Sequence, residues 1–104
     1  MAKDTVDNIR YSTIQCGEVS GSATAKQLPS IVAALFWISA PNSNTGDVYL
    51  GGAGVTVPEG TTDVTAGLEL QPGDTVGPLP ITNLNLFYII CDNATDDITY
   101  LALV

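Results

Sequence analysis

The C-terminal stretch LELQPGDTVGPLPITNLNLFYIICDNATDDITYLALV (residues 68–104) does most to predict the fold class. It contains two apolar runs, at 86–91 and 98–104, and the second run alternates with the period of a β-strand. Proline and glycine occupy the central positions of a type II turn at 72–74. The stretch therefore predicts short strands that are joined by tight turns.

The strongest apolar run, IVAALFWISA (31–40), lies between Pro29 and Pro41. Its periodicity fits either a short buried helix or a strand that is apolar on both faces. The two prolines limit any helix to about three turns, and the aromatic pair Phe36 and Trp37 is typical of a central strand of a sandwich. We therefore expect a strand, with both aromatic rings in the core.

Short strands and turns account for the rest of the chain. We expect the first strand to end at Gly17, and we place strands at 9–16, 18–25, 47–50, 55–57, 68–71 and 76–81. The strand spacing of about 8–12 residues predicts an all-β fold, an antiparallel β-sandwich or jelly-roll-like arrangement of eight or nine short strands. Residues 17–104 would form the sandwich body of a single domain, and residues 1–16 an N-terminal arm or first strand.

The composition excludes several classes of protein. Charged residues make up 13% of the 104 residues, against roughly 25% in an ordinary globular protein, which argues against a disordered chain and a coiled coil. Eleven acidic and three basic residues give a net charge of −8, and nucleic-acid binding is not expected because phosphate contacts need Lys and Arg. The absence of histidine excludes Ser-His-Asp and Cys-His catalysis and histidine-containing metal sites.

The charges are distributed unevenly along the chain. Residues 1–26 hold all three cations, Lys3, Arg10 and Lys26, together with three carboxylates. Residues 27–104 hold no cation and eight carboxylates: Asp47, Glu59, Asp63, Glu69, Asp74, Asp92, Asp96 and Asp97. Two interpretations stay open: a solvated acidic surface that keeps the protein soluble, or a docking face for a basic partner with the neutral segment as an arm.

The carboxylates form no recognisable catalytic or metal-binding pattern. Glu59, Glu69 and Asp74 are candidate members of a glycosidase pair, but such a site also needs an aromatic-lined cleft, and aromatic residues make up only 7% of the chain. The acids of the loop 92–97 supply oxygen ligands without the EF-hand order, so an Asx-rich turn is favoured over a calcium site. We therefore expect no enzymatic activity, no catalytic residues, no cofactor and no metal.

The two cysteines, Cys16 and Cys91, match no CxxC metal or redox pattern. No hydrophobic stretch follows Lys3, so a signal peptide is not expected, and free, buried thiols are favoured over a disulfide. The longest apolar run, within residues 31–38, is shorter than the about 20 residues needed to span a membrane. We expect no contact with a membrane.

A resemblance to a known class of proteins rests on five motifs in their order along the chain: QLPSI (27–31), NSNTGDVYLGG (42–52), GVTVPEG (54–60), LELQPGDTVGPLPITNLNLFYII (68–90) and ITYLAL (98–103). In this order the motifs resemble small β-sandwich virion proteins of tailed bacteriophages. Among these, the chain is similar to capsid decoration, or cement, proteins. The resemblance covers residues 27–104 and brings no catalytic residues with it.

The resemblance implies a structural protein on the capsid exterior, made in the host cytoplasm, that stabilises the capsid by bridging subunits of the major capsid protein. It also implies a homo-oligomer, usually a trimer. The N-terminal arm lies outside the resemblance and holds two of the three cations, so we expect it to contact the capsid or a neighbouring subunit. Its candidate contact residues are Lys3, Asp4, Ile9, Arg10 and Tyr11.

Two alternative functions stay open. The first is a head-fibre or tail-associated host-binding module of a phage. The second is a small carbohydrate-binding sandwich, for which several exposed aromatic side chains would be expected.

Overall fold

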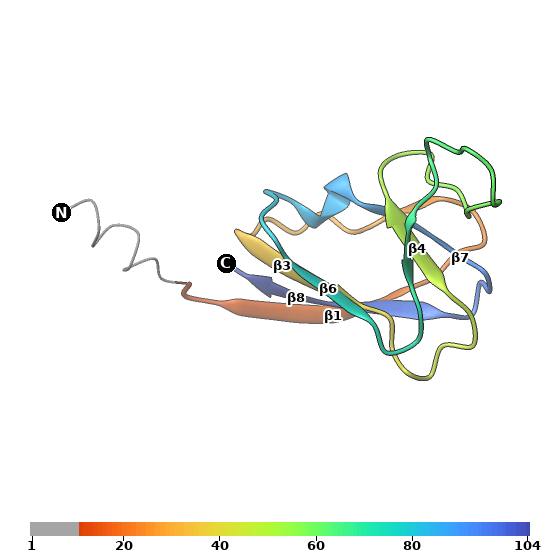
Figure 1. Cartoon of the computed structure of the whole chain (residues 1–104). Helices are drawn as coiled ribbons and strands as arrows, with labels where there is room; N and C mark the ends of the chain where they lie inside the picture. Colours follow the sequence, from red (N-terminus) through yellow and green to blue (C-terminus); the bar gives the residue numbers. More distant parts are fainter. Residues whose placement is uncertain (1–10) are drawn as a thin grey trace.

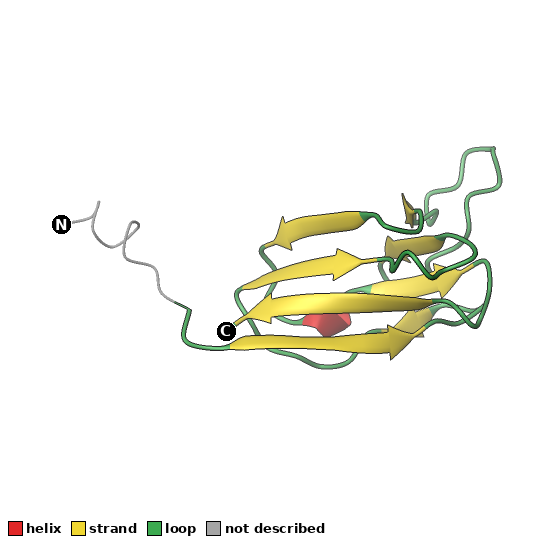
Figure 2. Ribbon diagram, turned by 90° about the horizontal axis from the view of Figure 1, so that it is seen from below, coloured by secondary structure: helices red, strands yellow, loops and turns green. Residues whose placement is uncertain are grey.

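The computed structural model describes residues 11–104, which form two antiparallel β-sheets packed face to face (Figure 1). The strands are β1 (Ile14–Ser20), β2 (Lys26–Gln27), β3 (Leu35–Ser39), β4 (Val48–Gly51), β5 (Leu68–Leu70), β6 (Thr75–Leu79), β7 (Tyr88–Cys91) and β8 (Asp97–Leu103). Within the described residues, the single short helix is the 3-10 helix η1 (Leu84–Leu86), drawn in red in Figure 2. The prediction of an all-β antiparallel sandwich is confirmed.

The core lies between the two sheets. Sheet A has the strand order β1-β8-β3-β6, and sheet B has the order β2-β7-β4-β5. Fully buried side chains come from central strands of both sheets, among them Phe36, Ile38, Val48, Ile89 and Ile98. Because successive strand residues point to opposite faces, every second residue of sheet A points away from this core.

Two of the connections between the sheets meet at one end of the sandwich. β3 leads to β4 through residues 40–47, and β7 leads to β8 through residues 92–96. Since β3 and β8 are neighbours in sheet A and β4 and β7 are neighbours in sheet B, the two connections lie side by side. Hydrogen bonds between them hold the sheets together at this end of the sandwich.

Asp96 joins the two connections. Its side chain is only 3% exposed, and its carboxylate accepts hydrogen bonds from the backbone N–H of Thr45 at 3.0 Å and of Gly46 at 2.9 Å. Asn44 completes the link: its Nδ2 donates to the carbonyl oxygen of Asp97 at 2.8 Å, and its Oδ1 accepts from the Asp97 N–H at 3.0 Å. The Thr45 N–H contributes most to holding the pKa of Asp96 below its usual value. We term this group of hydrogen bonds the turn clamp.

The N-terminal strands differ from the prediction. Gly17 does not end a strand, because β1 pairs with β8 in one unbroken register over seven residues. Tyr100 lies opposite Gly17, and a Cβ atom on the glycine would be 2.7 Å from the tyrosine hydroxyl oxygen, so the aromatic side chain fills this space. Residues 18–25 therefore form no strand of their own. The expected limit of the N-terminal arm at residue 16 lies inside β1.

The later elements follow the sequence more closely. The turn at 72–74 is confirmed: the φ angle of Gly73 is +94°, and the Asp74 N–H donates to the Gln71 carbonyl at 2.9 Å. β6, which contains Pro78, lies at a sheet edge as predicted.

One expectation for the second half of the chain is wrong. Residues 55–57 form no strand and make only an isolated bridge between Thr56 and Ala66. The C-terminal strand β8 lies inside sheet A, between β1 and β3.

We expect Asp96→Ala to lower the free energy of unfolding by about 3 kcal/mol, because two partly buried hydrogen bonds from backbone N–H groups lose their charged acceptor. Urea unfolding at pH 7 measures the effect. Glu59→Ala, at an exposed acid on the loop between β4 and β5, is the control and should change stability by less than about 0.5 kcal/mol.

The same pair of proteins gives a test by pH. The pKa of Asp96 is lowered from 3.8 in the folded state, so its stabilising contribution is present above that value and is lost as the pH falls through the lowered pKa. The stability difference between the parent and Asp96→Ala should shrink accordingly. A difference that is the same at pH 7 and at pH 2 would contradict the role of the charged carboxylate.

Candidate functional site

The expected contact residues of the N-terminal arm are described only in part. Lys3, Asp4, Ile9 and Arg10 lie outside the described residues. Tyr11 precedes β1, and its side chain is 39% exposed. The arm as a capsid contact therefore stays a prediction.

Apolar side chains lie on the outer face of sheet A, turned away from the core. We define this face by the outward-pointing side chains of its four strands: Ile14, Cys16, Glu18, Ser20, Leu35, Trp37, Ser39, Thr75, Asp97, Thr99, Leu101 and Leu103. Ile14 is 68% exposed and Leu101 is 39% exposed. Glu18 and Asp97 are the charged residues of this set, and Asp97 lies opposite Ser20 at the end of the face away from Ile14, so the half of the outer face around Ile14 and Leu101 is apolar and neutral.

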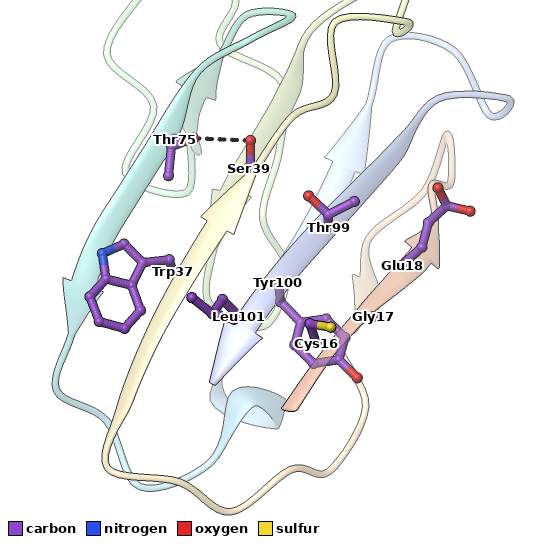
Figure 3. A pocket seen from close by; sticks show the side chains of 9 residues that line it. All are labelled: Cys16, Gly17, Glu18, Trp37, Ser39, Thr75, Thr99, Tyr100 and Leu101. Carbon is purple, nitrogen blue, oxygen red and sulfur yellow. Dashed lines mark hydrogen bonds between the residues drawn. The ribbon is translucent and has the colours of Figure 1, made fainter. Parts of the chain in front are cut away.

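The middle of the outer face is hollowed. The hollow has a volume of about 690 Å³ and is lined by residues of β1, β3, β6 and β8 (Figure 3). Trp37 of β3 lies opposite Leu101 of β8 in the strand register, and Cys16 of β1 lies on the other side of Leu101. These three side chains form the apolar part of the lining.

Trp37 is not in the core, contrary to the prediction, whereas Phe36 is fully buried as expected. The two rings point to opposite faces because they belong to successive residues of one strand. Gly77 allows the indole to lie against β6: its φ angle is +144°, and a Cβ atom there would be 2.7 Å from Trp37 Cδ1. Ser39 lies two positions after Trp37 and therefore points to the same face of the strand. This polar residue was the signal in the sequence that the face of Trp37 is turned away from the core.

The hydroxyl groups at one end of the hollow bind each other. Thr75 Oγ1 donates to Ser39 Oγ at 3.0 Å, and Ser39 Oγ donates to the carbonyl oxygen of Asp74 at 3.1 Å. Thr99, Glu18, Ser20 and Asp97 are the remaining polar side chains of the outer face. Because a sugar site needs converging polar groups around its aromatic platform, this hollow fits an apolar protein side chain better than a sugar.

Both cysteines are free thiols, but only one of them is buried. Burial raises the pKa of the Cys91 thiol. Cys16 is exposed on the outer face, contrary to the expectation of two buried thiols. The outer face therefore carries a thiol that solvent can reach, while the second thiol is shielded.

Four carboxylates gather near the turn clamp. Partial burial of the Asp47 carboxylate contributes most to raising its pKa, and repulsion from Glu69, Asp92 and Asp74 raises the pKa further. We term these four residues the acidic cluster. Glu69 and Asp74, two of the acids considered for a glycosidase pair, belong to it, whereas Glu59 lies on the loop between β4 and β5.

The described part of the chain supplies little positive charge to balance the acidic cluster. Lys26 is the one cation in residues 11–104, and its Nζ donates to the carbonyl oxygen of Ser20 at 2.9 Å. The acidic cluster is therefore a concentration of like charge that a basic partner would stabilise.

The acids of the loop 92–97 bind backbone groups. Asp92 Oδ2 accepts a hydrogen bond from the Asp47 N–H at 3.1 Å, and Asp96 is the centre of the turn clamp. Both bonds reach across to the connection 40–47, so they are not the local bonds of the Asx-rich turn that the sequence favoured. Within residues 11–104, no three His, Cys, Asp or Glu side chains are grouped so that they could hold a metal ion.

Comparison with protein-family models, curated proteins and solved structures gives no match for this chain. In the described part of the chain, no helix has the length and apolar character needed to cross a membrane. The function is therefore argued from two surfaces of the sandwich, the outer face of sheet A and the acidic cluster.

We expect Gly77→Ala to lower the free energy of unfolding by about 2 kcal/mol, because the new methyl group meets both Trp37 and the backbone. Emission of the single tryptophan should shift to longer wavelength as the indole is displaced into solvent. Gly52→Ala is the matched control, since nothing lies within 4 Å of its added Cβ atom. Equal stability losses in the two variants would contradict the packing of Trp37 against Gly77.

We expect Asp47→Asn to raise stability at pH 7 and to have no effect at pH 2. The pKa of Asp47 is raised in the folded state, so its ionisation opposes folding once the pH exceeds the usual value of 3.8. Asp63→Asn should have the opposite sign at pH 7, because the Thr56 hydroxyl does most to lower the pKa of Asp63. Thermal unfolding at both pH values measures the two differences, and the same sign for both variants would contradict this assignment.

Proposed function

We propose that the chain is a non-enzymatic structural protein of a tailed bacteriophage, which decorates the capsid exterior and stabilises it by bridging subunits of the major capsid protein. The observation that carries the proposal is the acidic cluster. Burial does most to raise the pKa of Asp47, and repulsion from Glu69, Asp92 and Asp74 adds to it. The described residues hold a single lysine. The resemblance of residues 27–104 to decoration proteins supplies the class of partner.

A basic rim on a coat subunit would relieve the repulsion within the acidic cluster. The attraction would also steer the protein to the shell, and it would weaken with salt because the groups are exposed. A protein that binds only the assembled shell stabilises it by mass action, by about 2.7 kcal/mol per site at a hundredfold excess over Kd. Bridging several coat subunits increases this effect through effective concentration.

One observation favours the carbohydrate-binding alternative. Trp37 is on the surface, where an indole ring can stack on a sugar. The hydroxyl groups of Ser39 and Thr75 beside it are engaged within the protein, which weakens this alternative. Binding of the isolated protein to an oligosaccharide array, lost in Trp37→Ala, would replace the decoration proposal.

The proposal is tested on virions that carry the protein. The protein is stripped from the capsid, and the melting temperature of the shell is measured with and without adding it back. The variant Asp47→Asn/Glu69→Gln should bind more weakly, whereas Glu18→Gln/Glu59→Gln, which removes the same amount of charge elsewhere, should bind as the parent does. Binding of the parent should weaken as salt is raised.

Equal shell melting temperatures at saturating occupancy would overturn the decoration proposal in favour of host binding. Equal weakening by the two double variants would show that net charge, and not the acidic cluster, is responsible. Deletion of residues 1–8 tests the arm separately and should lower occupancy without changing the fold. Unchanged occupancy would remove the arm from the contact.

A further inference from the structure

β1 is paired along only one of its two edges within the described residues. It lies at the edge of sheet A, next to β8. In an antiparallel pair, the backbone N–H and C=O groups of every second residue point to the partner strand. The N–H of Gly21 donates to the Asp96 carbonyl, so the backbone groups of Gln15, Gly17 and Val19 also point to β8. The intervening residues direct theirs outward, and Lys26 Nζ binds the Ser20 carbonyl on this open side. Lys26 thus covers one end of the edge and leaves the rest open.

The other three sheet edges are protected from pairing. β6 contains Pro78, which removes a backbone donor, and β2 and β5 are only two and three residues long. β1 is seven residues long, and Ile14–Ser20 contains no proline, no lysine and no break in its register with β8. An open edge of this kind is a template for pairing with another strand.

The first half of β1 is also uncovered on both faces. Ile14 and Cys16 point outward from sheet A, and Gln15 points to the opposite side, yet all three are exposed. Ile14, at 68% exposure, continues the apolar outer face that Leu101 and Trp37 form around the hollow. Exposed apolar surface beside an open backbone edge marks an interaction site.

The distribution of charge favours a second copy of this chain as the occupant. Two copies that each carry a net charge of −8 repel one another. Of the eight carboxylates of residues 27–104, only Asp97 lies on the outer face, opposite Ser20 at the end of β1 away from Ile14. Contact along β1 therefore joins the two chains where their repulsion is weakest. Three registers are possible in which β1 pairs antiparallel with a second β1, with Gln15, Cys16 or Gly17 lying opposite itself at the centre. In none of these registers does Glu18 of one copy lie opposite Glu18 of the other.

We propose that β1 is the self-association site of this protein, where the open edge of one copy pairs antiparallel with the same edge of a second copy. The pairing closes both open edges at once, joins the two A sheets into one sheet and covers Ile14 of each copy. It gives two-chain assemblies, in place of the trimer that the sequence resemblance implies. The inference goes beyond the proposed function, because it concerns the free protein without a capsid.

The test is sedimentation velocity of the full chain over a range of micromolar concentrations. The parent should sediment as a dimer, and Ile14→Lys should raise the dissociation constant about tenfold or more, since a lysine on an open edge opposes pairing. Val64→Lys is the matched control: it adds the same charge at a residue that is 95% exposed on a loop, and it should leave the dimer intact. Higher salt should strengthen the dimer by screening the repulsion.

The exposed thiol of Cys16 gives a second readout of the same contact. In all three registers the two Cys16 Cα atoms would lie about 5–8 Å apart, within reach of a short bismaleimide, whereas the buried Cys91 does not react. The parent should give a covalent dimer, and Ile14→Lys should give much less. A monomer at all concentrations, a three-chain mass, or a dimer that is unaffected by Ile14→Lys would each overturn the proposal, whatever the outcome of capsid binding.

Discussion

The turn clamp is the interaction on which the rest of the sandwich depends. A carboxylate as buried as that of Asp96 is costly unless its oxygens are hydrogen-bonded, and the backbone N–H groups of Thr45 and Gly46 each bind one oxygen. The Asp96 carbonyl in turn accepts from the N–H of Gly21, directly after β1, at 2.7 Å. Asp96 therefore binds the end of the edge strand β1, and it joins the β3–β4 connection to the β7–β8 connection.

The clamp also decides where charge and apolar surface lie. β1 and β8 run antiparallel, so Ser20 lies opposite Asp97 beside the clamp, and Ile14 lies opposite Leu103 at the other end of the pair. Six strand steps separate these ends by about 20 Å. The acidic cluster adjoins the clamp, because the Asp92 carboxylate binds the Asp47 N–H there. The charged surface and the open half of β1 are thereby kept apart.

Strands β3, β7 and β8 could be predicted from apolar runs, and the type II turn from its proline and glycine, because these signals are local in sequence. The course of β1 could not be predicted, and for the position of Trp37 the sequence offered only the polar residue Ser39 two positions later. Tyr100 packs over Gly17, and Gly77 makes room for Trp37, so each outcome depends on a residue far along the chain. Asp96 was one of eight carboxylates in its part of the sequence, and only the folded connections show which of them is buried.

The acidic cluster and the open half of β1 lie far enough apart that substitutions in one need not affect the other. Substitutions more than about 7–10 Å apart, with no shared partners, act additively on stability, and the turn clamp shares partners with the acidic cluster but not with Ile14. The net negative charge also has opposite effects on the proposed self-contact and on the proposed contact with a basic partner. Between two copies with a net charge of −8 it opposes association, whereas toward a basic partner the same charge favours it. Under the two proposals, ionic strength is expected to shift the protein between self-contact and contact with a basic surface without any change in the fold.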